Sequence, residues 1–265
     1  MLKDITLGQF FPGDTVIHRL DPRTKLLMVI IYIIALFQAE TWLSYGIVLA
    51  AAALCMLLAK IGPANMFKGL KPMIIIIIFT AVLNIFYTKG TPVIEGWIIT
   101  WEGIEKAGKM ILRIVLLITG TFMLTYTTSP ISLTDGLEYL LSPLKKLGLH
   151  VHELTMMMSM ALRFIPTLIE ETDKIMSAQK ARGADFETGN IIERAKALIP
   201  ILVPLFVSSF RRADELAVAM ECRCYHGGEG RTKLKVLKMK AGDYTALALS
   251  LAFLALIIFL KVIYA

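Results

Sequence analysis

Residues 71–87 read Lys-Pro-Met-Ile-Ile-Ile-Ile-Ile-Phe-Thr-Ala-Val-Leu-Asn-Ile-Phe-Tyr, and this stretch decides the fold class. Five consecutive isoleucines follow Met73, and no charged residue stands between Lys71 and Tyr87. An apolar run of this kind suits the hydrocarbon core of a bilayer better than the interior of a soluble domain. We therefore expect a membrane-spanning helix over residues 73–87, opened by Lys71-Pro72.

Similar apolar runs lie on both sides of this stretch. Hydrophobic residues make up 56% of the 265-residue chain, more than a soluble domain of this length carries. The predicted fold class is an all-α integral membrane protein with about five transmembrane helices, at residues 26–38, 43–59, 73–87, 102–126 and 244–264. Lys106, Lys109 and Arg113 lie near the start of the fourth helix. Snorkelling, or a partner such as Glu102 or Glu105, is expected to accommodate their charge.

The distribution of basic residues predicts the topology. Residues 128–242 hold 16 of the 28 lysines and arginines, whereas residues 88–104 hold one lysine and two glutamates. Because cytoplasmic loops collect lysine and arginine, the N-terminus and residues 60–71 and 128–242 are expected in the cytoplasm of a bacterial cell, with the C-terminus outside. The expected organisation is an N-terminal segment with transmembrane helices 1–4 (residues 1–127), a cytoplasmic helical domain (128–242) and a C-terminal transmembrane helix (243–265).

The cytoplasmic domain is predicted to contain two long helices, at residues 152–182 and 191–225, after a shorter one at residues 132–147. Each long helix has an arginine at or near its C-terminal end: Arg182, directly before Gly183, in the first helix and Arg223 in the second. The two arginines are 41 positions apart. A basic residue followed by glycine is a common helix C-cap. Two copies in one segment indicate instead a shared binding role, and the residues alone leave both interpretations open.

A group of methionines lies near the start of the first long helix, at Met156, Met157, Met158 and Met160. Such a group can fill a core. Because methionine is flexible and polarisable, it can also form an adaptable surface that repacks against different partners.

Motifs of catalysis, metal binding and nucleic-acid binding are missing from the sequence. It has no Gly-x-Ser-x-Gly, no Walker A loop and no His-Glu-x-x-His. Cys222, Cys224 and His226 alternate, but no further ligand pair stands nearby at zinc-finger spacing, so no metal site is predicted. The basic residues alternate with apolar stretches rather than with aromatic residues, which disfavours nucleic acid as a partner. The chain is therefore expected to bind no cofactor and to catalyse no reaction.

Four motifs, in this order along nearly the whole chain, resemble the transmembrane T component of energy-coupling factor (ECF) transporters. They are Leu20-Asp-Pro-Arg-Thr-Lys-Leu26, Ala181-Arg182-Gly183, Phe210-Arg-Arg-Ala-Asp-Glu-Leu216 and Arg223-Cys-Tyr225. The resemblance implies a non-catalytic coupling subunit of an ATP-driven importer. It implies two ABC-type ATPases, which use ATP and Mg, and a small membrane S component, which binds a vitamin or other micronutrient and can be one of several interchangeable S components.

In that family, Ala-Arg-Gly-type motifs end two coupling helices, and each motif binds in a groove of one ATPase. The resemblance implies that two sets of residues in this chain bind the ATPases. The first set is Ala181, Arg182 and Gly183, and the second is Cys222, Arg223 and Cys224. The second set departs from Ala-Arg-Gly on both sides of its arginine, which keeps the charge and changes the neighbouring packing. The methionine group then becomes the expected S-component contact.

Three alternatives are kept beside this interpretation. One is the related T component of a cobalt or nickel importer, although the Arg-Gly-Ala-Asp-Phe run from Arg182 favours the vitamin type. Another is the permease of a conventional ABC system, which usually has one coupling helix per subunit. The last is a membrane-embedded enzyme, which requires clustered acids, histidines or a nucleophile near the interface.

Overall fold

The computed structural model describes residues 10–92, 99–148, 150–186, 188, 190–227 and 237–264. Over these residues the chain is helical, and the β-contact that it contains is an isolated antiparallel bridge between Pro92 and Thr100. The predicted all-α membrane fold is therefore confirmed. The chain divides into two compact units, one of Gly8–Leu140 with Val236–Ala265 and the other of Leu141–Lys235.

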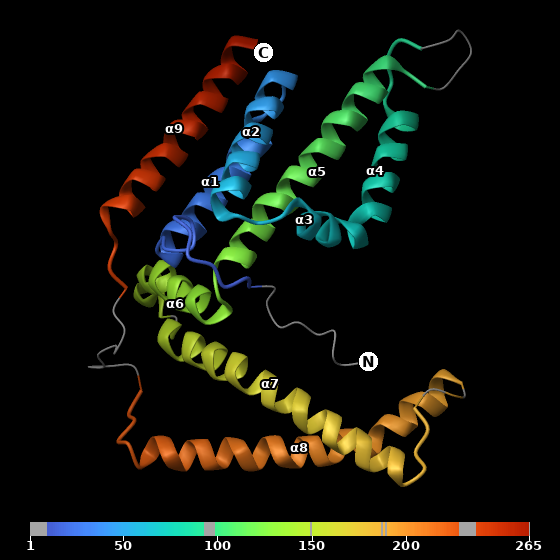
Figure 1. Cartoon of the computed structure of the whole chain (residues 1–265), viewed down its shortest axis with the longest axis vertical. Helices are drawn as coiled ribbons and strands as arrows, with labels where there is room; N and C mark the ends of the chain where they lie inside the picture. Colours follow the sequence, from blue (N-terminus) through green and yellow to red (C-terminus); the bar gives the residue numbers. More distant parts are fainter. Residues whose placement is uncertain are drawn as a thin grey trace. The chain divides into compact units, whose positions relative to one another are not determined.

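The first unit is a helical bundle (Figure 1). α1 packs against α9 and α5, α2 packs against α5, and α4 packs against α5. Side chains from α1, α2, α5 and α9 share a buried core that includes Leu36, Tyr45, Leu116 and Ile257. The helices of this unit are α1 (Pro22–Gln38), α2 (Trp42–Ala59), α3 (Pro63–Leu70), α4 (Ile74–Tyr87), α5 (Trp101–Thr127), α6 (Pro130–Leu141) and α9 (Ala241–Tyr264).

Four helical segments of the described chain are long and apolar enough to cross a membrane: Trp42–Ala59, Pro63–Tyr87, Trp101–Thr127 and Ala241–Tyr264. The second includes α3, which occupies part of the sequence that was expected to be a basic loop, and a 3-10 turn at Lys71–Met73 joins α3 to α4. The first predicted span lies within α1, whose 17 residues reach only about 25 Å along the helix axis. A fifth span therefore stays a prediction.

Close approach of the helices depends on small residues. Gly120 of α5 lies where an added Cβ would overlap the ring of Tyr32 in α1. The Tyr32 hydroxyl donates a hydrogen bond of 3.0 Å to the carbonyl oxygen of Leu116, one turn earlier in α5. The absence of a side chain at Gly120 thus lets an aromatic ring lie against the α5 backbone.

The charged residues near the start of α5 have partners. Lys109 Nζ lies 2.7 Å from Glu105 Oε1, so the expected pairing is confirmed for this lysine. Arg113 bonds to groups that were not anticipated: its Nε donates to the Tyr45 hydroxyl at 2.9 Å, and its NH2 donates to the Ala39 carbonyl at 3.2 Å. Ala39 ends α1 and Tyr45 lies in the first turn of α2, so both partners are near the turn that joins these helices. Their oxygen atoms keep the charged Arg113 side chain hydrogen-bonded.

The Asp21-Pro22 start of α1 is a capped helix terminus. The Asp21 side chain accepts a hydrogen bond from the Arg23 N–H, and Pro22 occupies the first helical position. Asp243 at the start of α9 accepts from the Asp21 N–H at 2.7 Å. Lys25 donates to the carbonyl of Thr127 at 2.8 Å, which ties the start of α1 to the end of α5.

α6 belongs to the bundle by its contacts. A Cβ added at Gly136 would lie 3.1 Å from Pro22 Cβ, and the Arg23 guanidinium stacks 3.6 Å from the centre of the Tyr139 ring. The second compact unit therefore begins at Leu141. The cytoplasmic domain that the distribution of basic residues predicts begins earlier, at residue 128. The helix predicted over residues 132–147 ends earlier than expected, because Pro143 turns its last part into a 3-10 segment at Ser142–Leu147.

Candidate functional site

The second unit consists mainly of two helices of 31 residues each, α7 (Val151–Ala181) and α8 (Ile191–Glu221) (Figure 1). Their side-chain contacts show that they run antiparallel. Glu171 of α7 accepts hydrogen bonds from Ser208 and Arg212 of α8, and Gln179, further along α7, donates to Pro200, earlier in α8. The C-terminal ends of the two helices therefore lie at opposite ends of the pair.

The end of α7 is a Schellman motif around Arg182, which is the C-cap residue. The Gly183 N–H donates to the Lys180 carbonyl at 3.0 Å, and the Ala184 N–H donates to the Gln179 carbonyl at 3.0 Å. Gly183 has a φ of +89°, a conformation that glycine adopts without steric cost. The helix thus ends sharply, directly after Ala181.

The end of α8 repeats this pattern 41 residues later. The Cys224 N–H donates to the Glu221 carbonyl at 2.8 Å, and the Tyr225 N–H donates to the Met220 carbonyl at 3.1 Å. Cys224 takes the position of Gly183 and has a φ of +56°. The second motif therefore keeps the backbone of the first, although neither Cys222 nor Cys224 matches the residues that flank Arg182.

The six predicted ATPase-contact residues are exposed: Ala181, Arg182, Gly183, Cys222, Arg223 and Cys224. Within the described residues, neither arginine side chain has a hydrogen-bond or ion-pair partner in the chain itself. Each arginine follows by 11 residues the point where Glu171 of α7 meets Arg212 of α8. The two arginines lie on opposite sides of this point, each about 16 Å along the axis of its own helix, so one small ligand cannot bridge them.

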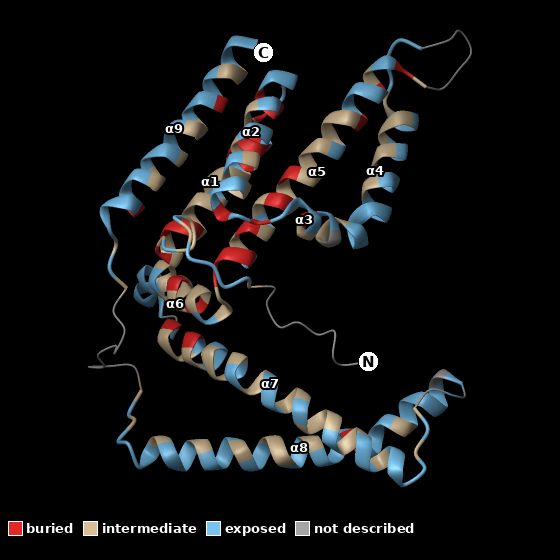
Figure 2. Ribbon diagram, in the orientation of Figure 1, coloured by how far each residue is buried: buried red, intermediate tan, exposed pale blue. Residues whose placement is uncertain are grey.

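Few of the described residues of α7 and α8 are buried (Figure 2). Of the predicted partner-contact methionines, Met157 and Met158 are 58% and 36% exposed, whereas Met156 and Met160 are half-buried. The larger exposed apolar surface lies on α8, and the sequence did not assign it to a particular partner protein. Its exposed members are Ile192, Leu198, Ile199, Leu202, Val203, Phe206, Val207, Phe210 and Val218.

The signal for this surface was present in the sequence. The run Ala197–Phe210 is strongly apolar but too short to span a bilayer, which predicts that it packs against the membrane face or another helix. The structure describes most of its large side chains as exposed, with Ile201, 4% exposed, as an exception. An exposed apolar surface of this extent is typical of a protein or membrane contact.

Among the described residues, no group of three His, Cys, Asp or Glu side chains lies close enough to hold a metal ion. Cys55 is half-buried, and Cys222 and Cys224 are free thiols. The distinctive chemistry of this unit is therefore that of an apolar surface and of two guanidinium groups that have no partner among the described residues, which suits binding to other proteins.

Comparison with known proteins gives the family. A family model described as cobalt transport protein matches residues 13–234. The chain is 55% identical to the energy-coupling factor transporter transmembrane protein EcfT of Clostridium kluyveri, over 93% of each chain. It is 48% identical to the EcfT of Ruminiclostridium cellulolyticum over 100% of both chains, and 48% identical to that of Bacillus subtilis over 98% of this chain and 100% of the relative. The chain therefore belongs to the family of energy-coupling factor transporter transmembrane proteins, and it is a membrane component of a transporter rather than an enzyme.

Proposed function

We propose that this chain couples two cytoplasmic ABC-type ATPases to a small membrane S component that binds a vitamin or other micronutrient. One observation carries the proposal: α7 and α8 end in the same Schellman motif, each with an exposed arginine whose side chain has no partner within the described part of the chain. Two equivalent ends suit two homologous partners. In this proposal the ATPases bind ATP and Mg, and this chain binds neither.

The chemistry of arginine supports the ATPase contact. Its guanidinium is always charged and presents a rigid fork of donors that can bind a carboxylate through two hydrogen bonds. Arg182 and Arg223 stand directly before residues of positive φ, Gly183 and Cys224, where the chain turns away from the helix axis. Each arginine therefore lies at the exposed end of a long helix, in a position to enter a groove on a partner.

The exposed apolar side chains of α8 support the S-component contact. Phe206 and Phe210 are 61% and 68% exposed, and Met157 of α7 is 58% exposed. Water contact with these side chains is unfavourable, and their burial against an apolar membrane protein stabilises an assembly. A surface that contains methionine can also adapt to different S components.

The proposed location is a bacterial cell membrane, with the N-terminus and the α7–α8 unit in the cytoplasm and the C-terminus outside. The excess of lysine and arginine in residues 128–242 supports this orientation. A cobalt or nickel importer is the second candidate, because the matching family model is described as cobalt transport protein. The names of the relatives favour the general energy-coupling factor type.

Affinity purification of the tagged full chain, expressed together with its genomic neighbours, tests the proposal. We expect two ATPase subunits and one small membrane protein to copurify with it. Recovery of ATPases with a second copy of this chain, and without a small membrane protein, would indicate a conventional ABC permease instead. A cobalt or nickel importer is distinguished by which S component copurifies and by whether it binds a metal ion.

A further inference from the structure

Glu171 and Arg212 form an ion pair where α7 and α8 meet. The Arg212 NH2 lies 3.0 Å from Glu171 Oε2, and the Ser208 hydroxyl donates to the other carboxylate oxygen. The two charged side chains are only 29% and 26% exposed. Such a pair is better shielded from solvent than an ordinary surface ion pair, and breaking it leaves a partly buried charge without its partner.

The two partners occupy equivalent positions in the two helices. Glu171 precedes Arg182 by 11 residues, and Arg212 precedes Arg223 by 11 residues. The ion pair therefore joins α7 and α8 at equal distances from their two arginines, about 16 Å along each axis. A small change of crossing angle at this point moves both arginines by similar amounts.

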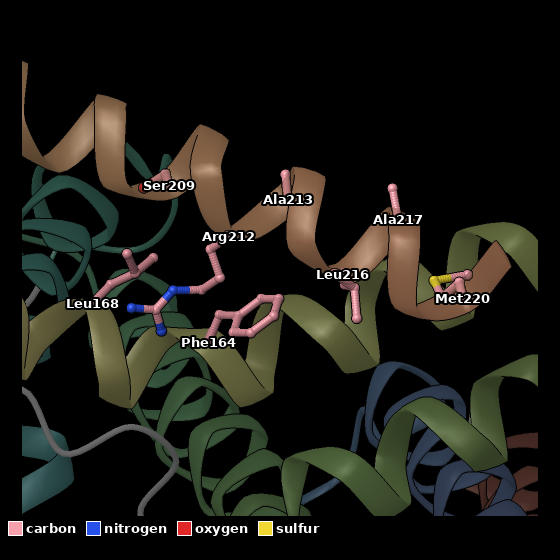
Figure 3. Close-up of a pocket in the computed structure, with 8 residues that line it drawn as sticks. All are labelled: Phe164, Leu168, Ser209, Arg212, Ala213, Leu216, Ala217 and Met220. Atoms are coloured by element: carbon pink, nitrogen blue, oxygen red, sulfur yellow. The ribbon is translucent and has the colours of Figure 1, made fainter. Parts of the chain in front are cut away.

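Apolar packing beside the ion pair is incomplete (Figure 3). A groove of ≈ 240 Å³ lies between the helices, with Phe164 and Leu168 on the α7 side and the small residues Ala213 and Ala217 on the α8 side. The Arg212 side chain extends from α8 toward α7, with its guanidinium 5.7 Å from the centre of the Phe164 ring. Tight interdigitation does not fix the crossing here, so the polar contacts have a larger part in setting it.

A second polar contact lies further along the pair. Pro204 has no N–H, so the Pro200 carbonyl loses the donor that would complete its intrahelical hydrogen bond. The Gln179 side chain donates to this carbonyl at 3.4 Å. This weaker bond and the Glu171–Arg212 pair together define the register between the two helices.

We propose that Glu171 and Arg212 are positioning residues, whose ion pair holds α7 and α8 at the crossing that sets the separation of Arg182 and Arg223. Neither residue contacts an ATPase in this proposal. The inference rests on the proposed coupling function, because it explains how two separate docking points are kept in register. Loss of the pair lets the ends of α7 and α8 that carry Arg182 and Arg223 move independently. The movement that ATP hydrolysis causes in the ATPases is then no longer transmitted to the S component.

A distance measurement tests the mechanical part without any partner. Spin labels are attached at Ser177→Cys and Val218→Cys, two exposed positions 41 residues apart, in the full chain with its three native cysteines changed to serine. We expect Glu171→Gln to broaden the distance distribution. The reversed pair, Glu171→Arg with Arg212→Glu, should narrow it again. An unchanged distribution in Glu171→Gln would overturn the proposal.

Transport by the complete reconstituted complex tests the functional part. For Arg212→Met we expect the uptake per ATP hydrolysed to fall about 10-fold or more, the effect of losing a charge-assisted hydrogen bond, while ATPase copurification persists. The matched controls are Glu170→Gln and Arg211→Met, neighbours that are exposed and have no described partner, and they should keep wild-type coupling. Unchanged coupling in Arg212→Met would overturn the inference. Failure of the proposed function itself appears separately, as wild-type ATPase docking in Arg182→Ala.

Discussion

Replacing Gly183 with alanine is expected to weaken ATPase docking at the α7 end while leaving the charge of Arg182 intact. Gly183 has a φ of +89°, which an L-residue adopts only with strain. This strain weakens the hydrogen bonds that the Gly183 and Ala184 N–H groups donate to the carbonyls of Lys180 and Gln179. These bonds end α7 and orient the arginine, so their loss lets the tip of the helix fray.

The magnitude follows from the backbone conformation. A side chain in the left-handed region costs about 1–2 kcal/mol, so docking at this end should weaken by at most about 5- to 30-fold. Nothing lies within 4 Å of a Cβ added at Gly183, so steric overlap with the rest of the chain adds no further cost. At the α8 end the equivalent position is Cys224, which already carries a side chain at a φ of +56°. Replacing it with glycine removes this strain, so the effect on ATPase docking has the opposite sign. Cys224→Gly should make the free energy of ATPase docking at the α8 end more favourable by roughly 1 kcal/mol at most.

The assay is a titration of the purified chain, held with its S component in lipid nanodiscs, with each ATPase separately. Gly183→Ala should weaken binding of one ATPase, and Cys224→Gly should strengthen or preserve binding of the other. Gly46→Ala is the control, since its Cβ meets nothing within 4 Å and its helix lies in the bundle. Equal weakening of both ATPases by Gly183→Ala would refute the reasoning that the two ends act as separate docking points.

Three further predictions concern the bundle, the apolar surface and the topology. Gly120→Ala should lower the thermal unfolding temperature of the purified protein, because its Cβ overlaps the Tyr32 ring, whereas Gly46→Ala should not. Met157→Glu and Phe206→Glu should reduce S-component recovery while ATPase recovery persists; equal loss of both would indicate a collapsed fold. A reporter fused to the C-terminus should be detected outside the cell, and cytoplasmic detection would contradict five spans with the N-terminus inside.

The sequence predicted those features that depend on local chemistry. Gly183 follows Arg182 and ends α7, as a glycine C-cap does, because capping depends on a few adjacent residues. The run of isoleucines at 74–78 lies in α4, which is part of a candidate span. Residue chemistry and chain order suffice for features of this kind.

Features that depend on tertiary contacts were not predictable. Arg113 bonds to Tyr45 and to the Ala39 carbonyl, which are distant in sequence, rather than to the neighbouring glutamates. The matching backbone of the α8 end was also hidden, because Cys224 is an unusual residue for a positive φ. The 41-residue spacing of Glu171 and Arg212 became informative only once the structure placed them in contact.

The most direct measurement of the central claim is substrate uptake by the complete transporter with Arg182→Ala and Arg223→Ala combined. Removal of one partner from a charged pair at an interface typically costs about 2–5 kcal/mol. Each single variant should therefore dock its ATPase roughly 30-fold more weakly or worse, and lysine should rescue only in part because it lacks the donor fork. The double variant should insert normally, keep its S component and show no uptake. Wild-type uptake at normal expression would contradict the account and leave both arginines as simple helix caps.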